Sequence, residues 1–245
     1  MTRGAAERQG HAVLDLPSRG LKARKIAALL GAAPGEPPRR MLEIGCGSGG
    51  ISHWFGTDGP MGWDVQAVDV EDVRMVADGY SFQLVSGTSL PFENGSFDVV
   101  ISNHVIEHVG EADAQRAHLM EVRRVLRTQG MAYLAVPNRW MLLEPHFRLP
   151  FLSWFPRRVA DAYVRAAGRG QHYDCRPLSS CAIERMIERA GFDWQHHAGR
   201  ALRITFELEN ARAPLYRLVL RFMPDGAFRM LRRLFPTLIY TLRPR

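Results

Sequence analysis

A run of small residues, Leu42-Glu-Ile-Gly-Cys-Gly-Ser-Gly-Gly50, has the composition of a loop that binds a nucleotide-type cofactor. Glycines at positions 45, 47 and 49 allow a tight turn and let a ligand approach the backbone closely. The predicted helix over 50–56 would direct free N–H groups and a partial positive charge to the same place. Glu43 adds a carboxylate that suits a ligand with a cationic amino acid. We therefore expect a cofactor cradle over residues 43–50.

The glycine spacing alone leaves the cofactor open. Gly45, Gly47 and Gly50 also satisfy the G-x-G-x-x-G pattern of NAD- and FAD-binding folds, which is a weak signal by itself. Glu43 counts against that alternative, because its charge would repel a pyrophosphate. A solvated acid at a strand end is the other explanation of Glu43, and the less frequent one. Asp69 ends the next predicted strand, where a carboxylate can accept hydrogen bonds from both ribose hydroxyls of either cofactor.

Three further motifs follow in order along the chain: Leu90-Pro-Phe92, Ser96-Phe-Asp98 and Glu107-His-Val109. Together with the glycine turn, they make the chain resemble the class I S-adenosylmethionine-dependent methyltransferases, in particular the methyltransferase type 11 branch. The resemblance is strong over residues 40–137 and looser as far as Phe192. It implies S-adenosylmethionine as the cofactor. It also implies an α/β fold with a Rossmann-like, doubly wound sheet of seven strands, mostly parallel with an antiparallel last strand.

The same resemblance implies which residues surround the cofactor. Glu43, Gly45, Cys46, Gly47 and Gly49 would border the methionine moiety, Asp69 and its neighbour Val70 the ribose, Ser86, Gly87 and Thr88 the adenine, and Ser102 and Asn103 the methyl end of the pocket. Most relatives carry Asp where Ser86 stands. The contact to the adenine amino group is therefore expected from a backbone carbonyl or from Thr88.

The acceptor side offers three histidines as candidate general bases: His104 after the fourth strand, His146 in Leu143-Glu-Pro-His146, and His172 in Gln171-His-Tyr-Asp174. Methyl transfer from a sulfonium mostly needs alignment and exclusion of water, so only an oxygen acceptor calls for a base. A structural or solvated histidine is the more frequent alternative for each. Glu107 and His108 belong to the family signature and are expected to orient backbone. We expect no metal site.

Composition narrows the class of protein. The chain has 245 residues, of which 46% are hydrophobic, enough for one α/β core. No apolar run is as long as a membrane span, and the N-terminus lacks a signal-peptide pattern. The three cysteines have no metal or iron–sulfur spacing, which favours a cytoplasmic protein and disfavours radical chemistry on S-adenosylmethionine.

The net charge of +7 is concentrated at one end, because residues 212–245 contain eight arginines and one acid. These arginines alternate with Leu, Phe and Met, so peripheral contact with the inner face of a membrane is one alternative. A solvated basic face is the more frequent one. Basic residues interleaved with aromatics in an RNA-binding pattern are absent from the sequence, and nucleic acid is not expected as a partner.

We expect a single domain over 1–245 with three additions: an N-terminal helical extension (1–38), a lid insertion after strand five (138–172), and basic C-terminal helices with an edge strand (212–245). Strands are predicted over 40–44, 65–69, 81–85, 97–102, 130–136, 192–207 and 237–242, and helices over 21–30, 50–56, 71–78, 112–127, 159–167, 179–190 and 212–234, the last broken at 224–226.

The predicted lid suggests what the acceptor is like. It contains four aromatic residues that we expect at the surface: Phe147, Phe151, Trp154 and Phe155. They indicate an apolar or lipid-attached acceptor or a homodimer contact, and a small satellite core is the alternative. We therefore predict methyl transfer to a small-molecule or lipid- or carrier-linked acceptor. The alternatives are a cofactor-binding fold without methyltransferase activity and an NAD-dependent oxidoreductase.

Overall fold

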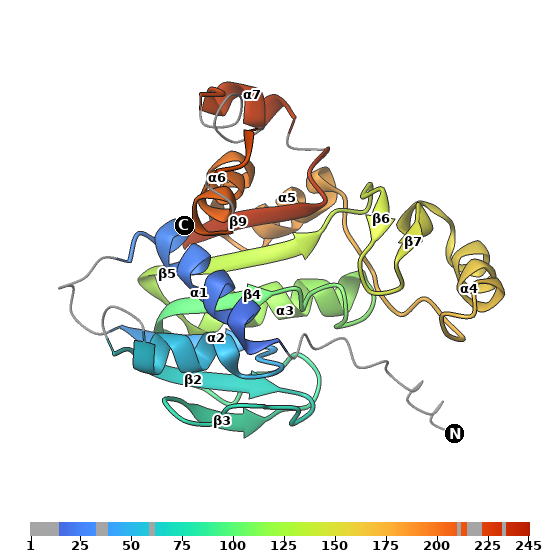
Figure 1. The fold of residues 1–245 in the computed structure, drawn as a ribbon. Helices are drawn as coiled ribbons and strands as arrows, with labels where there is room; N and C mark the ends of the chain where they lie inside the picture. The colour runs from blue at the N-terminus through green and yellow to red at the C-terminus, as the bar shows by residue number, and fades with distance from the viewer. Residues whose placement is uncertain (1–14, 33–38, 59–61, 210–211, 215–221, 232–233) are drawn as a thin grey trace, which may run out of the picture.

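The computed structural model describes residues 15–32, 39–58, 62–209, 212–214, 222–231 and 234–245. Its centre is a seven-stranded sheet in the order β3-β2-β1-β4-β5-β9-β8 (Figure 1). The strands are β1 (Arg40–Ile44), β2 (Asp64–Asp69), β3 (Ser81–Leu84), β4 (Phe97–Asn103), β5 (Leu126–Pro137), β8 (Phe192–His196) and β9 (Thr237–Pro244). Strands β1 to β5 pair in parallel, and β9 is antiparallel to both β5 and β8. The predicted fold class is confirmed.

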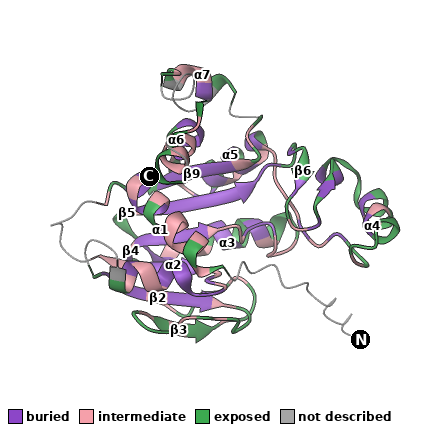
Figure 2. Cartoon of the chain, viewed as in Figure 1, coloured by how far each residue is buried: buried purple, intermediate pink, exposed green. Residues whose placement is uncertain are grey.

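Helices cover both faces of the sheet. They are α1 (Leu16–Leu30), α2 (Gly50–His53) with a π-helical turn η1 (Trp54–Asp58), α3 (Ala112–Val125), α5 (Ser180–Arg189), α6 (Ala198–Glu209) and α7 (Asp225–Met230). Neighbouring residues of a strand pack into the hydrophobic cores on opposite faces of the sheet, because side chains alternate across a strand. Leu42 and Val100 pack with α3 and α5, whereas Met41 and Val99 pack with α1, α2 and α6. Such strands are buried on both faces, as Figure 2 shows.

The segment between β5 and α5 forms a separate small unit. It contains the two-residue strands β6 (Leu143–Glu144) and β7 (Leu149–Pro150), a 3₁₀ turn at Leu152–Trp154 and helix α4 (Arg157–Ala166). Figure 1 shows this insertion projecting beyond the end of β5. Its own apolar cluster includes Phe147, Leu152, Val164 and Tyr173. Phe147 is 3% exposed, so it is a core residue and not one of the surface aromatics that the sequence predicted.

Three predicted elements differ from the structure. No helix forms over 71–78; instead the amides of Met75 and Val76 donate to the Ser48 carbonyl, which holds the β2–β3 connection against the glycine turn. The strand predicted over 192–207 stops at His196, and α6 follows. Strand β9 lies inside the sheet between β5 and β8, and not at its edge.

Helical spacing explains why α6 replaces the predicted strand. Ile204, Thr205 and Phe206 have high strand propensity, yet Ala198 and Ala201 are buried at helical spacing, and Leu202 and Phe206 pack against Phe228 of α7. Of the helix pair predicted over 212–234, α7 is described, and most of the first helix lies outside the described residues.

The β2–β3 connection crosses the π-helical turn η1 at two glycines. A Cβ on Gly56 would overlap the backbone carbonyl group of Gly79, with 2.7 Å to the carbonyl carbon. Gly79 itself has φ +82°, and its own Cβ would press on Thr57. This backbone crossing fixes the connection that borders the glycine turn.

Within the described part of the chain, every helix is too short or too polar to cross a bilayer.

Candidate cofactor and acceptor site

The glycine turn after β1 has three residues with positive φ: Gly45 (+74°), Gly47 (+52°) and Gly49 (+79°). Gly45 lies against the loop after β4, where a Cβ would meet Val105 Cγ2 at 2.5 Å. Gly49 is buried, and a Cβ there would meet the Val76 carbonyl oxygen at 2.6 Å. Of these three glycines, Gly45 and Gly47 are half-exposed and Gly49 is not. They are the glycines that a ligand can approach, whereas Gly49 makes room for the β2–β3 connection.

Asp69 connects the end of β2 to this turn. Its Oδ2 accepts a hydrogen bond from the Gly47 amide (2.8 Å), and its Oδ1 accepts one from the Val70 amide (2.7 Å). Each carboxylate oxygen can accept a further hydrogen bond, and the residue is half-buried at the sheet edge where ligands bind in open α/β folds. Asp69 is therefore oriented by the backbone and suited to receive ribose hydroxyls.

Glu43 belongs to β1, directly before the turn, and is fully buried. Its Oε2 accepts a 2.5 Å hydrogen bond from Ser52 Oγ. Burial raises the pKa of the Glu43 carboxyl to about 8, although the Ser52 hydrogen bonds and the Arg19 charge oppose the shift. A buried carboxyl with a raised pKa gains most from a nearby cation, because a positive charge favours its ionised form. The residues present thus fit a sulfonium-containing amino acid better than a pyrophosphate.

Proton release from Glu43 gives a testable consequence. If a cationic cofactor ionises Glu43, the affinity of the protein for that cofactor should rise with pH. The rise should span the range between the ordinary carboxyl pKa of 4.5 and the raised pKa of about 8, at no more than about tenfold per pH unit. Titration calorimetry with S-adenosylmethionine between pH 6 and pH 8 measures this slope. Glu43→Gln keeps the shape of the side chain but cannot release a proton, so it should flatten the slope of affinity against pH. An equal slope in the variant would show that another group releases the proton.

The remaining predicted cofactor residues surround this centre. The Cys46 thiol is buried, and burial raises its pKa well above the ordinary range, so it acts as a neutral wall of the turn. Ser86 and Gly87 are exposed directly after β3, whose end is joined to β2 by the hydrogen bond from the Val85 amide to the Asp69 carbonyl (2.9 Å). Thr88 is half-buried beside them.

Ser102 and Asn103, both predicted at the methyl end of the cofactor pocket, have different surroundings at the end of β4. Ser102 is buried, and its Oγ lies 2.9 Å from His118 Nε2 in α3, so its side chain faces the helix layer and not the cofactor turn. Burial lowers the pKa of His118 to about 4, which keeps this imidazole neutral. Asn103 follows with a buried Oδ1 that has no hydrogen-bond partner among the described residues. Asn103, unlike Ser102, therefore has an atom to offer a ligand.

The three candidate bases have different surroundings. His104 has φ +59°, and its Nδ1 lies 3.2 Å from Glu107 Oε1. His146 Nδ1 lies 2.9 Å from Glu144 Oε1. His172 is largely exposed on the insertion, 3.8 Å from Asp161 Oδ2.

Glu107 stands between the histidines after β4. Burial alone would raise the pKa of this carboxyl, but His104 and His108 beside it hold the pKa below its ordinary value. Glu107 is therefore a carboxylate that orients His104. The sequence marked Glu107 only as part of a signature, and this pairing is a contact three residues apart in a turn.

The structure also brings Cys175 and His108 to His146, which the sequence did not indicate. The His108 and His146 rings are 5.3 Å apart, and each Nδ1 lies 3.8 Å from Cys175 Sγ. The three residues are separated by long stretches of sequence, so no local motif relates them.

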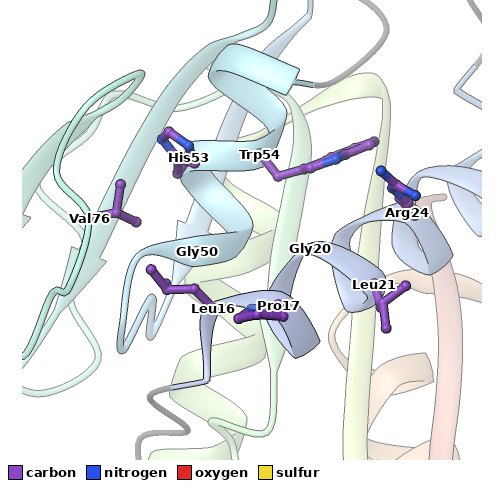
Figure 3. Close-up of a pocket in the computed structure, with 9 residues that line it drawn as sticks. All are labelled: Leu16, Pro17, Gly20, Leu21, Arg24, Gly50, His53, Trp54 and Val76. Carbon is purple, nitrogen blue, oxygen red and sulfur yellow. The ribbon is translucent and has the colours of Figure 1, made fainter.

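A pocket of about 540 Å³ lies between α1 and α2 (Figure 3). It is lined by Leu16, Pro17, Gly20, Leu21, Arg24, Gly50, His53, Trp54 and Val76. Of the predicted cofactor cradle, Gly50 is among them, but none of the residues assigned to the methionine, ribose or adenine moiety is. The pocket borders the end of the glycine turn at Gly50, whereas Asp69, Gly47 and Glu43 do not line it.

Known proteins match this chain in sequence and in fold. Residues 42–134 match the family model described as a methyltransferase domain. A ubiquinone biosynthesis O-methyltransferase of Sinorhizobium fredii is 24% identical over 71% of this chain and 70% of its own length. A ribosomal RNA small subunit methyltransferase C of Chromohalobacter salexigens is 28% identical over 65% of this chain, but the match spans only 46% of that protein.

Among solved structures, the [4+2]-cyclase SpnF superimposes with a TM-score of 0.54 at 15% identity, covering 97% of this chain and 84% of that one. The strand order adds a distinction of its own. Dinucleotide-binding folds continue 3-2-1-4-5-6 in parallel, whereas here the antiparallel β9 stands between β5 and β8. This order and the family match overturn the NAD alternative: residues 42–134 form a methyltransferase domain, and the chain as a whole resembles the class I S-adenosylmethionine-dependent methyltransferases.

Proposed function

We propose that this protein transfers a methyl group from S-adenosylmethionine to the oxygen of a small-molecule or lipid- or carrier-linked acceptor. The observation that supports it best is the junction of β1 and β2, where the Asp69 carboxylate is held by the Gly47 amide above the buried Glu43. This arrangement pairs an acceptor for ribose hydroxyls with a carboxyl that a cation would ionise.

The cofactor, when bound, supplies a methyl group already activated by the sulfonium. Gly45 and Gly47 would allow close approach to the backbone, and Glu43 would balance the positive charge from below. Asp69, with Val70 beside it, would fix the ribose, and Ser86, Gly87 and Thr88 would border the adenine. Gly49 and Cys46 would shape the turn, and Asn103 would reach the methyl end through its buried Oδ1. These groups hold the donor in line with the acceptor, which is where most of the acceleration arises.

The end of β4 supports an oxygen acceptor. His104 is held by the Glu107 carboxylate at a backbone angle that few non-glycine residues adopt. A histidine oriented in this way can accept a hydroxyl proton as the methyl group is transferred. The ubiquinone biosynthesis relative is named an O-methyltransferase, which agrees with this proposal.

The insertion supports an apolar acceptor. Several aromatic or aliphatic side chains of this segment are at least 39% exposed, among them Leu143, Phe151, Trp154 and Phe155. Trp154 is held in place, because its Nε1 donates to the Met141 carbonyl (2.9 Å). Apolar groups kept at the surface near the acceptor end of the sheet are typical of a site for a hydrophobic ligand.

Asp69→Ala tests the cofactor site. The variant loses a charge-assisted pair of hydrogen bonds, so S-adenosylmethionine should bind more weakly by about 1 to 3 kcal/mol, or roughly 5- to 150-fold. Calorimetry measures the dissociation constant. Glu71→Ala is the matched control, because it removes an exposed acid two residues away. An unchanged constant in the Asp69 variant would mean that the ribose is held elsewhere.

The activity itself is tested by incubating the protein and S-adenosylmethionine with fractionated metabolite extracts, both water-soluble and lipid-soluble. A product heavier than its precursor by one methylene group, together with S-adenosylhomocysteine, is the expected result. Enrichment in the lipid-soluble fraction supports the apolar acceptor. Cofactor binding without methylated product in either fraction would oppose the proposal.

A second candidate is a cofactor-binding fold that catalyses another reaction. SpnF is named a [4+2]-cyclase, and its fold resembles this chain over most of its length. In that case the protein would bind S-adenosylmethionine and leave it unchanged, whatever the acceptor supplied.

A further inference from the structure

A compact cluster of soft metal-binding groups lies where the insertion meets the loop after β4. His108 belongs to that loop, His146 lies between β6 and β7, and Cys175 lies between α4 and α5. Cys175 Sγ is 3.8 Å from His108 Nδ1 and 3.8 Å from His146 Nδ1. One potential ligand atom from each residue lies within 4.8 Å of the other two.

These separations match what a metal ion imposes on its ligands. Zinc binds sulfur at about 2.3 Å and imidazole nitrogen at about 2.0 Å, so a tetrahedral site places sulfur and nitrogen about 3.5 Å apart. The two sulfur–nitrogen distances of 3.8 Å need only a small inward movement. Two imidazoles and one thiolate are ligands that favour zinc over magnesium or calcium. Cys175 is buried, and both histidines are half-buried, which shields such a site from solvent.

Two buried carboxylates surround the cluster. Glu144 accepts from the Phe147 amide (2.7 Å), and its Oε1 lies 2.9 Å from His146 Nδ1, so on zinc binding it would release this nitrogen to the ion and keep its negative charge beside the site. Glu107 Oε1 lies 4.0 Å from His108 Nε2, and Glu107 Oε2 is buried without a hydrogen-bond partner among the described residues. Buried negative charge on two sides would be offset by a divalent cation.

We propose that His108, His146 and Cys175 bind one zinc ion that fastens the insertion to the loop carrying His104. The three ligands come from segments far apart in the sequence, so the ion would cross-link the insertion to the loop at the end of the sheet. This proposal does not depend on methyl transfer. It departs from the expectation of no metal, which considered only spacing along the chain.

Cobalt(II) is the probe, because a thiolate–cobalt bond gives a near-ultraviolet charge-transfer band, whereas a thiolate–zinc bond gives no such band. The full-length protein is stripped with a chelator, titrated with cobalt(II), and then back-titrated with zinc. We expect one cobalt per chain, a charge-transfer band and tetrahedral visible bands, all displaced by zinc. Atomic spectrometry of the protein purified with zinc should give one equivalent.

Cys175→Ser should abolish the charge-transfer band, and His146→Ala should weaken cobalt binding. The matched control is Cys181→Ser, which removes the exposed cysteine and should leave the band intact. Circular dichroism and S-adenosylmethionine binding report whether each variant is folded, so a failed cofactor site is distinguished from a failed metal site. Absence of the band in the wild-type protein at saturating cobalt, or its persistence in Cys175→Ser, would overturn the proposal.

Discussion

Replacing His104 with asparagine should lower kcat by about 10²- to 10⁴-fold, the usual contribution of a general base. Asparagine tolerates positive φ, so the backbone angle of +59° can be kept while the imidazole is lost. Binding of S-adenosylmethionine should stay nearly unchanged, because the proposed cofactor contacts lie at Asp69, Gly47 and Glu43. Formation of S-adenosylhomocysteine with the methylated fraction measures the rate.

Two comparison variants identify the cause of the loss. His172→Asn removes a largely exposed histidine of the insertion and should leave kcat within about twofold. Glu107→Gln keeps the imidazole but removes the carboxylate that orients it, so we expect an intermediate loss and a shifted pH profile. A rate that does not change in His104→Asn would exclude His104 as the base and favour an acceptor that arrives already deprotonated.

Gly56→Ala should destabilise the fold by about 3 kcal/mol, at the upper end of overpacking costs. The added methyl group would overlap the Gly79 carbonyl, which is backbone and cannot rotate away as a side chain does. For a domain of this size the change corresponds to a fall in Tm of roughly 6 to 12 °C. Denaturant and thermal unfolding, followed by circular dichroism, provide the measurement.

Gly20→Ala is the control for this substitution. Gly20 lies inside α1, and its Cβ would meet nothing within 4 Å, so alanine should stabilise the helix by about 0.5 to 1 kcal/mol. If Gly56→Ala is as stable as the wild type, the β2–β3 connection can move away from η1. The contact between that connection and the glycine turn would then not be fixed in solution.

The parts that could be predicted from the sequence are those set by local signals. The strand, the glycine turn and Asp69 occur within thirty residues, and alternating strands and helices imply the parallel sheet. Helix α5 was predicted over 179–190 and runs over Ser180–Arg189, because Ser179 caps it through the Ala182 amide and Gly191 ends it. In each case one short segment contains the whole physical reason.

The parts that could not be predicted depend on contacts between distant segments. Residues 71–78 have a helical composition, but backbone hydrogen bonds to Ser48 decide their conformation. Ser102 was expected in the pocket, yet His118 in the next helix attracts its hydroxyl. The cluster of His108, His146 and Cys175 exists only after the insertion has folded back on the loop after β4.

The place of β9 has a consequence for synthesis on the ribosome. Strands β5 and β8 are both made before β9, but each pairs with β9 and not with the other. Until β9 emerges, β5 is an edge strand with unpaired backbone N–H and C=O groups, and β8 has no strand with which to pair. The insertion and α5 are translated within this interval, so the β5 edge stays available for pairing with other strands until β9 closes it.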